Sequence, residues 1–210
     1  MEIKERILLK AEVLFWKFGT RTITMDDIAR DLGISKKTLY QHFTDKDDIV
    51  YQVIQYRMEK NRAHVVSQVA DAHDPIEEIM LASRIVRQQL AEMNPALLID
   101  IQRHHPRAWE ICTEFKEKFL LESMRSNLKR GIEQGLYRPE INVEIMARLR
   151  MELIGMAHNP NVFPTALGSM ADVQVELLHH FVRGILTEKG SIIYNQYVQD
   201  YQNDLTPVTR

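Results

Sequence analysis

Apolar residues recur along nearly the whole chain at the three- and four-residue spacing of an amphipathic helix. The first segment shows this most clearly, because a stripe of apolar side chains is followed by Gly19, a residue type that ends helices in the left-handed conformation. The stripe consists of Ile3, Ile7, Leu8, Ala11, Leu14, Phe15 and Phe18. No segment shows the alternation typical of a strand. The pattern therefore predicts an all-α fold of roughly ten helices.

Three hydroxyl residues mark expected helix starts within one short stretch of the chain. Thr24, Ser35 and Thr44 can each accept a hydrogen bond from the free amides of a first helical turn. Asp27 and Asp47 stand at the reciprocal capping position after the first and the last of them. We therefore expect three helices to begin in quick succession.

The segment 44–70 contains neither Gly nor Pro, so its helix is expected to run unbroken. Beyond it, capping residues and prolines suited to a first helical turn mark further helix starts. These are Asp74-Pro75, Asn94-Pro95, Pro106, Asn142 and Ser169. Helices are expected at 107–134, 142–158, 169–190 and 191–203, with a loop at 159–164.

The segment 24–43 has the parts of a helix-turn-helix, which needs a supporting helix, a tight turn and a second helix at a fixed angle. Ala29 is small where the two helices would cross, and Gly33 lies in the turn, where a positive φ is needed. The apolar residues that would pack the helices together are Ile28, Leu32, Ile34, Leu39 and Phe43. Because cap, turn and apolar spacing coincide, the segment predicts a DNA-binding motif.

The second helix of this motif exposes side chains that can neutralise phosphates and donate to base edges. We predict DNA contacts by Thr24, Ser35, Lys36, Lys37, Thr38, Tyr40, Gln41, His42 and Lys46. The residues assigned mainly to the phosphate backbone are Thr24, Tyr40 and Lys46. Mixed backbone and base contacts are assigned to Lys36, Lys37, Thr38 and Gln41.

Overall charge adds little to this prediction, because the 210-residue chain has a formal net charge of −2. Phosphate binding usually leaves a basic footprint. The first 60 residues contain 11 basic and 10 acidic side chains, an imbalance too small to indicate a partner. Placement is more informative, since the segment 32–44 carries Lys36, Lys37 and His42 and no acid. DNA affinity must then come from a few placed groups.

The N-terminal pattern resembles the DNA-binding domain of the tetracycline-repressor (TetR) family. The likeness lies in the run Phe15-x3-Gly19, then Thr24-x3-Ile28-Ala29-x3-Gly33-Ile34-Ser35-x2-Thr38-Leu39-Tyr40-x2-Phe43-x2-Lys46, followed by Asp48-Ile49-Val50. It covers residues 1 to about 60, and weaker echoes are Gly131-Ile132-x2-Gly135-Leu136-Tyr137 and the segment Leu177 to Gly190. Lys37 departs from members that have proline or a small residue there, which leaves the operator sequence open.

The resemblance implies an all-helical homodimer that binds a palindromic operator in double-stranded DNA and usually represses transcription. It implies a DNA-binding domain at 1–60, and a C-terminal domain at 61–210 that binds a small-molecule effector and forms the dimer. The identity of the effector, the operator and the controlled genes are left open.

The same resemblance implies that the last long helices of two subunits pair in a four-helix bundle. Candidates for this interface are Leu149, Leu153, Leu177, Leu178, Phe181 and Ile185. Periodicity does not tell whether the partner helix belongs to the same chain, so an intramolecular core is the alternative. Weak candidates for an apolar effector pocket are Met93, Trp109, Phe119 and Met151. At helical spacing such side chains are more often plain core.

Catalytic, metal and membrane functions find little support. The doublets His104-His105 and His179-His180 project about 100° apart on a helix and lack further ligands, so no metal or other cofactor is expected. An enzyme would need a nucleophile–base pair, and none is recognisable. The single cysteine excludes an internal disulfide. No apolar run could cross a bilayer, and the N-terminus lacks a secretion signal, so we expect a cytoplasmic protein.

The alternative to a regulator is a constitutive DNA-binding protein, which would show little preference between operator and random DNA.

Overall fold

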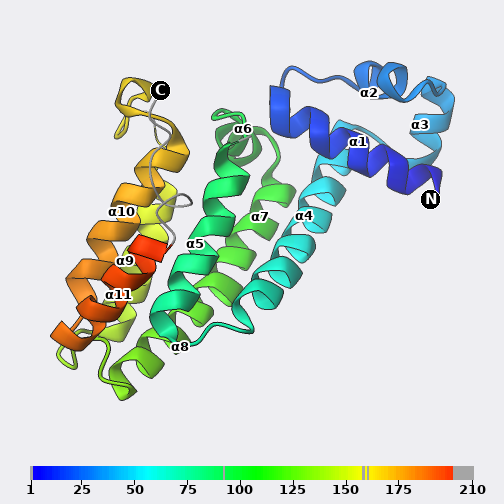
Figure 1. Cartoon of the computed structure of the whole chain (residues 1–210). Coiled ribbons are helices and arrows are strands. Elements are labelled where there is room, and N and C mark those ends of the chain that lie inside the picture. The colour runs from blue at the N-terminus through cyan, green and yellow to red at the C-terminus, as the bar shows by residue number, and fades with distance from the viewer. Residues whose placement is uncertain (1, 92, 158, 160, 201–210) are drawn as a thin grey trace. The chain divides into compact units, whose positions relative to one another are not determined.

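The computed structural model describes residues 2–91, 93–157, 159 and 161–200 (Figure 1). The regular secondary structure of this part of the chain is helical apart from one isolated β-bridge between Tyr137 and Leu186, and the all-α prediction is confirmed. Eleven α-helices are described, together with a π-helical segment at Phe115–Leu120 and a 3-10 turn at Thr165–Leu167. The α-helices are α1 (Ile3–Phe18), α2 (Met25–Leu32), α3 (Lys36–His42), α4 (Lys46–Val69), α5 (Pro75–Ala91), α6 (Leu97–His104), α7 (Pro106–Glu114), α8 (Leu121–Glu133), α9 (Val143–Met156), α10 (Met170–Ile185) and α11 (Glu188–Asp200). None of the described helices combines the length and the apolar composition that a membrane span requires.

Several helices begin where the capping signals predict. Thr24 starts α2 through a complete capping box with Asp27, and Ser169 starts α10 in the same way with Asp172. The side chain of Asn142 accepts a hydrogen bond from the third amide of α9, as an N-cap does. These predicted starts are confirmed.

The start of α4 differs by one residue from the prediction. Asp45 accepts the Asp48 amide in the first turn (2.9 Å), while the Thr44 amide donates to the Asp48 carboxylate (3.0 Å). Asp is at least as good an N-cap as Thr. Asp45 is therefore the N-cap instead of Thr44, and Asp48 is the reciprocal capping residue instead of Asp47. The helix then continues to Val69 without a break, as predicted.

The prediction of one helix at 169–190 is wrong at its C-terminal end, because the chain breaks into α10 and α11. The amide of Arg138 donates to the Ile185 carbonyl (2.8 Å), and the amide of Thr187 donates to the Leu136 carbonyl (3.0 Å). These bonds to the turn after α8 replace the hydrogen bonds that would continue the helix. Such long-range pairing has no signature in local periodicity.

The predicted long helix at 107–134 is continuous but irregular. α7 passes into the π-helical segment before α8 begins. A π segment changes the register of the backbone hydrogen bonds, which the apolar pattern did not reveal. Residue 158, residue 160 of the predicted loop and the predicted helix end at 201–203 lie outside the described residues.

Internal contacts divide the chain into two compact units. Unit 1 comprises the described residues of 1–62 and 92–115, and unit 2 comprises those of 63–91 and 116–210. Unit 1 therefore includes α6 and α7 as well as the N-terminal helices. The functional boundary predicted at residue 60 stays a prediction.

In unit 1 a buried ion pair joins α1 to α4. Glu12 accepts a hydrogen bond from Arg57, whose guanidinium lies 3.9 Å from the centroid of the Trp16 ring. The Asn94 amide donates to the Trp16 carbonyl (2.8 Å), which attaches the segment before α6 to α1. Removing either partner of the ion pair would leave an uncompensated charge in a largely buried place, so the junction between α1 and α4 needs both residues.

Unit 2 has a continuous apolar core to which α5, α8, α9, α10 and α11 contribute. Tyr137 is fully buried in it, and its hydroxyl donates to Asn127 (3.1 Å), whose amide group donates to the Pro75 carbonyl (2.8 Å). The Tyr137 ring packs so closely on Gly131 that a Cβ at this glycine would lie 2.0 Å from it.

Three of the predicted dimer contacts belong to this core. Leu178, Phe181 and Ile185 are almost completely buried within the chain itself. A side chain enclosed by its own subunit has no surface left for a partner, so these three are reassigned to the intramolecular core. Part of the surface stays exposed in the other three candidates, Leu149, Leu153 and Leu177.

Candidate nucleic-acid interface

Thr24 fixes the start of α2, the supporting helix of the motif. Its hydroxyl accepts the Asp27 amide (3.2 Å) and donates to the Asp27 carboxylate (2.6 Å), and its own amide donates to the same carboxylate (2.9 Å). These hydrogen bonds, together with the charge of Arg30, lower the pKa of Asp27. The stabilisation by this carboxylate is therefore present above the ordinary Asp range and is lost as the pH falls through the lowered pKa. To bind a phosphate, the Thr24 proton must turn away from Asp27.

The turn between α2 and α3 is a Schellman motif centred on Gly33. This glycine has φ +64° and ψ +32°, the left-handed conformation that side chains with a Cβ adopt at a cost. The Gly33 amide donates to the Arg30 carbonyl (3.2 Å), and the Ile34 amide donates to the Ala29 carbonyl (3.0 Å). The predicted positive φ at this position is confirmed, and the turn sets the angle of α3.

Gly33→Ala is expected to destabilise the protein by about 1 kcal/mol, because alanine must adopt the left-handed conformation. Space is not the cause, since a Cβ at Gly33 would meet no atom within 4 Å. Gly33→Asn is the matched variant, because asparagine tolerates this conformation better and should lose less. Thermal unfolding measures both, and equal stability of the two variants and the parent protein would show that the turn does not depend on glycine.

α3 begins at Ser35 and turns its apolar side inward. The Ser35 hydroxyl accepts the Thr38 amide (3.0 Å) and lies 2.8 Å from the Thr38 hydroxyl. Leu39 is completely buried and Phe43 nearly so, and α3 packs beside α2. The two hydroxyls are thus engaged with each other in the cap, whereas Leu39 and Phe43 orient the helix.

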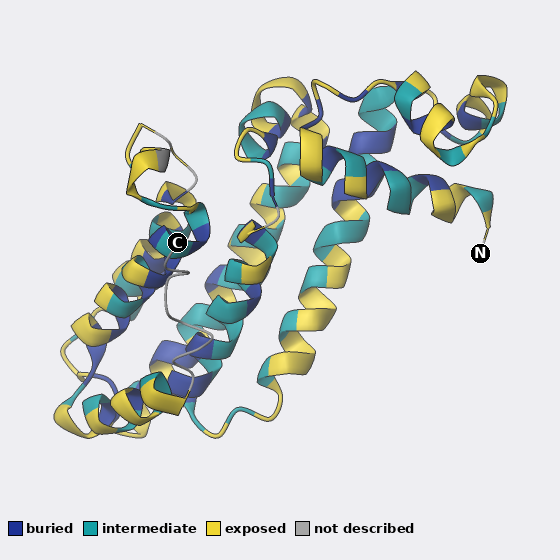
Figure 2. Cartoon of the chain, turned by 45° about the horizontal axis from the view of Figure 1, so that its top comes forward, coloured by how far each residue is buried: buried dark blue, intermediate teal, exposed yellow. Residues whose placement is uncertain are grey.

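The outer side of α3 presents Lys37, Tyr40 and Gln41, all exposed. Their spacing of three and four residues places them on one face of the helix. Figure 2 colours the chain by burial, with exposed residues in yellow and buried ones in dark blue. Tyr40 is 51% exposed, a large fraction for an aromatic side chain, and α3 contains no acidic residue. The structure therefore brings these three predicted residues together on one free surface.

Lys36 differs from its neighbour, because its Nζ pairs with the Asp26 carboxylate at 2.5 Å. Among the described residues, no acidic side chain forms an ion pair with Lys37. An exposed ion pair contributes between about 0 and 1 kcal/mol, so Lys36 can exchange Asp26 for a phosphate at little cost. Of the two lysines, Lys37 is the one that is ready to contact DNA without breaking an ion pair.

Lys46 and His42 are half-buried at the edge of this surface. Burial lowers the pKa of Lys46, and the charges of Asp100 and Asp27 oppose that shift. A lysine in such a place packs its apolar stem and directs its charge outward. Lys46 therefore has the geometry of a backbone contact at the margin of the motif.

One contact beside the motif was missed by sequence reasoning. Nδ1 of His105 lies 2.8 Å from Asp47 in the first turn of α4, and His105 is buried. Sequence reasoning considered this histidine only as part of the doublet His104-His105, which lacks further metal ligands, and assigned it no partner. The partners lie far apart in the chain, so no local signal could have paired them.

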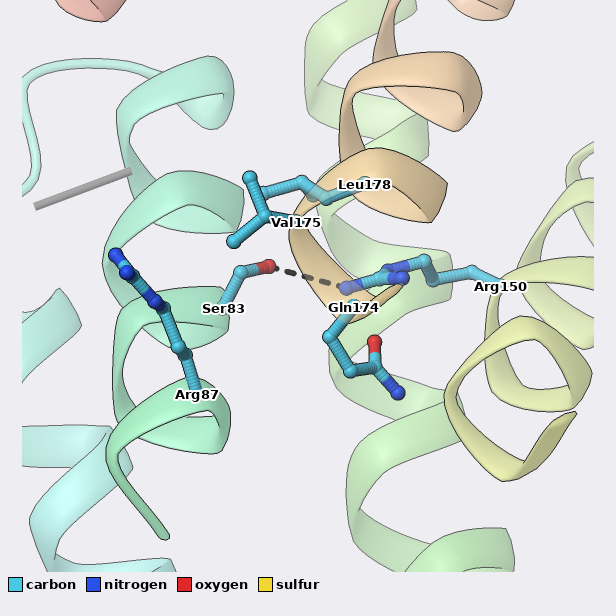
Figure 3. A pocket seen from close by; sticks show the side chains of 6 residues that line it. All are labelled: Ser83, Arg87, Arg150, Gln174, Val175 and Leu178. Atoms are coloured by element: carbon cyan, nitrogen blue, oxygen red, sulfur yellow. Dashed lines mark hydrogen bonds between the residues drawn. The ribbon is translucent and has the colours of Figure 1, made fainter. Parts of the chain in front are cut away.

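The predicted effector contacts are divided between the two units. Met93 and Trp109 belong to unit 1, whereas Phe119 and Met151 belong to unit 2, and they stay predictions. A small cavity inside unit 2 has a different lining: Ser83, Arg87, Arg150, Gln174, Val175 and Leu178 (Figure 3).

The described residues offer little for catalysis. No three side chains of His, Cys, Asp or Glu are grouped there as a metal ion would require. Burial raises the pKa of the Cys112 thiol to about 11, which disfavours the reactive thiolate at neutral pH. The surface of α3 is therefore the best-defined candidate site in unit 1.

Comparison with known proteins links this geometry to bacterial regulators. The sequence model of "Bacterial regulatory proteins, tetR family" matches residues 7–53. An HTH-type transcriptional regulator of Staphylococcus aureus (strain USA300) is 38% identical over 97 residues, which are 46% of this chain and 52% of that protein. One from strain MRSA252 is 39% identical over 82 residues, 39% and 44% of the two chains. The match spans about half the length of these curated relatives.

Solved structures extend the likeness to the whole fold. A TetR-family transcriptional regulator from Marinobacter aquaeolei VT8 has a TM-score of 0.72 at 22% identity and covers 99% of this chain and 100% of its own. A putative transcriptional regulator from Saccharomonospora viridis, solved in complex with choline, has a TM-score of 0.71 at 16% identity, with 88% and 98% covered. The N-terminal sequence match and the shared fold agree: residues 7–53 match the TetR family of bacterial regulatory proteins, and the fold of the chain is similar to that of TetR-family regulators.

Proposed function

We propose that this protein regulates transcription by binding a specific DNA sequence, with α3 in the major groove. The observation that carries the proposal is the outer face of α3, where Lys37, Tyr40 and Gln41 are exposed and no acid interferes. A lysine and a tyrosine can contact phosphates, while lysine and glutamine can donate to base edges. The family and its HTH-type regulators support the same function.

We further propose that the protein acts as a homodimer on a palindromic operator. Two copies of α3 would then enter successive major grooves about 34 Å apart. α9 supports a dimer, because Ile145 is 59% exposed and Leu149 is 42% exposed, one helical turn apart. Met156 is also exposed further along this helix. Since operator DNA lies in the bacterial cytoplasm, the proposed function places the protein there.

The proposed regulation is repression that a small-molecule effector relieves. Support comes from the fold, since a structural neighbour was solved with choline. α4 runs unbroken from Lys46 to Val69, with residues in both compact units. A continuous helix of this kind can convert a change around the effector into movement of the DNA-reading helices.

Selection of bound fragments from a random DNA pool tests the proposed function. We expect one enriched palindromic sequence, which the protein binds at least about a thousandfold more tightly than random DNA. Gel-shift competition between that sequence and random DNA measures the ratio. Equal competition by both would overturn sequence-specific regulation and favour a constitutive DNA-binding protein. An operator affinity that no effector changes would overturn the switch.

Tyr40→Ala and Lys46→Ala are expected to weaken binding to operator and random DNA alike, by about fivefold to tenfold each. Both side chains are assigned to the phosphate backbone, which carries no sequence information. Salt titration of the binding constant provides the readout, because a variant without the lysine neutralises fewer phosphates and its slope falls by about one unit per phosphate. Lys129→Ala in α8 is the matched control for Lys46→Ala, since it removes an exposed lysine far along the chain. If Tyr40→Ala lost affinity for the operator but not for random DNA, Tyr40 would be assigned to base recognition instead.

A further inference from the structure

Arg150 of α9 is buried in unit 2, and no described acidic side chain pairs with it. The residue is 2% exposed, and its Nη2 donates to the Ser83 hydroxyl of α5 (3.1 Å). Its Nη1 is also buried and has no hydrogen-bond partner among the described residues, and the guanidinium lies 5.9 Å from the centroid of the Phe181 ring. A buried guanidinium normally has a carboxylate beside it, because desolvating an unpaired charge is costly. Here a hydroxyl and an aromatic ring take that place.

A second unsatisfied polar atom lies in the same cavity. Gln174 of α10 is 4% exposed, and its Nε2 donates to the Ile154 carbonyl (2.7 Å), while its Oε1 is buried without a partner in the described part of the chain. Figure 3 shows the Arg150 side chain reaching from α9 toward Ser83, with Gln174 beside it. Two residues that each have a buried atom without a hydrogen bond, one a donor and one an acceptor, thus line the same cavity.

The charge of this cavity selects among possible occupants. Desolvation lowers the pKa of Arg150 to about 10, so the guanidinium is still charged at neutral pH. A cation would be repelled there, and a neutral water would satisfy hydrogen bonds but leave the charge uncompensated. A carboxylate would provide both the counter-charge and the acceptor that Nη1 lacks.

We propose that this cavity binds the carboxylate of a small organic acid, and that it is the anion-binding part of the effector site. Arg150 pairs with the carboxylate, Gln174 accepts a hydrogen bond from a hydroxyl or amide of the ligand, and Val175 and Leu178 contact its apolar part. The assignment to an effector rests on the proposed function. The cavity has a volume of about 10 Å³, the room of a single water molecule, so side chains of α5, α9 or α10 must shift to admit the acid.

The test uses the full chain without DNA and three probes of equal length: hexanoate, hexanol and hexyltrimethylammonium. Calorimetric titration and thermal unfolding are carried out at constant ionic strength, with chloride and with sulfate as the buffer anion. We expect hexanoate to bind and to raise the unfolding temperature, because only the acid complements Arg150. Hexanol and the ammonium compound should do neither.

Arg150→Met removes the charge and keeps much of the side-chain volume, and it is expected to weaken hexanoate binding at least about tenfold. Arg148→Met is the matched control, since Arg148 lies on the same helix but is exposed and paired with Glu144. Arg150→Lys retains the charge and should retain part of the affinity. Arg150→Lys therefore still tests the role of the charge if Arg150→Met fails to fold.

Undiminished hexanoate binding in Arg150→Met, equal binding of hexanol, or binding of chloride alone would each overturn the proposal. A separate measurement of operator affinity with and without hexanoate distinguishes failure of the proposed function from failure of the anion site. If hexanoate binds through Arg150 and the operator affinity is unchanged, the anion site stands and its regulatory role is refuted. If the protein binds no operator but still binds hexanoate through Arg150, only the proposed function fails.

Discussion

Gly131→Ala is expected to lower the free energy of unfolding by about 3 kcal/mol. The added Cβ would lie 2.0 Å from the Tyr137 ring, far inside the contact distance of two carbon atoms. The ring cannot move away easily, because Tyr137 is fully buried and its hydroxyl is hydrogen-bonded to Asn127, which in turn is bonded to Pro75. The new methyl group must therefore separate α8 from the turn that follows it. Urea denaturation followed by circular dichroism measures the loss.

Matched controls are two other helical glycines in the same unit. A Cβ at Gly155 of α9 or Gly184 of α10 would meet no atom within 4 Å. Alanine at these positions should leave stability unchanged or raise it by up to about 1 kcal/mol, since alanine is the better helix former. In the double variant Gly131→Ala, Tyr137→Leu, the smaller side chain should recover part of the loss. If Gly131→Ala is as stable as the parent, the close packing of Tyr137 on α8 is wrong.

The second large effect is expected for DNA binding by Lys37→Glu. In the proposed homodimer, reversing the charge removes one proposed contact from each subunit and places a carboxylate against phosphates, so two copies of the defect act on one operator. A good base contact contributes about 1–3 kcal/mol, and removing two lowers operator affinity about 30-fold or more. Gel-shift titration of the selected operator gives this ratio. The protein should stay folded, because Lys37 is exposed and contributes nothing to the core.

Lys129→Glu is the control for net charge, because it changes the total by the same amount at an exposed position of α8. Its operator affinity should stay within about twofold of the parent, since exposed charges beyond a Debye length are screened. Lys37→Ala separates base readout from phosphate binding, and we expect it to change which sequence is enriched from a random pool. Equal losses on every sequence would remove Lys37 from base recognition.

The DNA-binding motif could be predicted almost completely because its determinants are local. The Thr24 cap, the Ser35 cap and the Gly33 turn each depend on hydrogen bonds that span five residues or fewer. The apolar spacing that buries Leu39 leaves Lys37 on the outside. Next to this motif, local signals failed at the start of α4, where two possible caps competed.

Contacts between distant segments decided the features that the sequence did not predict. The ion pair of Lys36 with Asp26 and the contact of His105 with Asp47 join side chains on different helices, so spacing along the chain does not encode them. Both contacts change how the site is interpreted. The ion pair engages Lys36, which the sequence pattern does not distinguish from Lys37. The contact of His105 with Asp47 attaches the start of α4 to the segment before α7.

The sequence by itself determined the helical fold, the helix-turn-helix and the exposed face of α3 that we propose meets DNA, because hydrophobic period, caps and turn glycines act over a few residues. Only the tertiary structure decided how the C-terminal helices use their apolar faces. Leu178, Phe181 and Ile185 fill the subunit's own core, and Arg150, unremarkable in the sequence, is buried with no counter-charge among the described residues. The physical reason is that burial depends on which helices pack together, and periodicity shows that a face is apolar without showing what covers it.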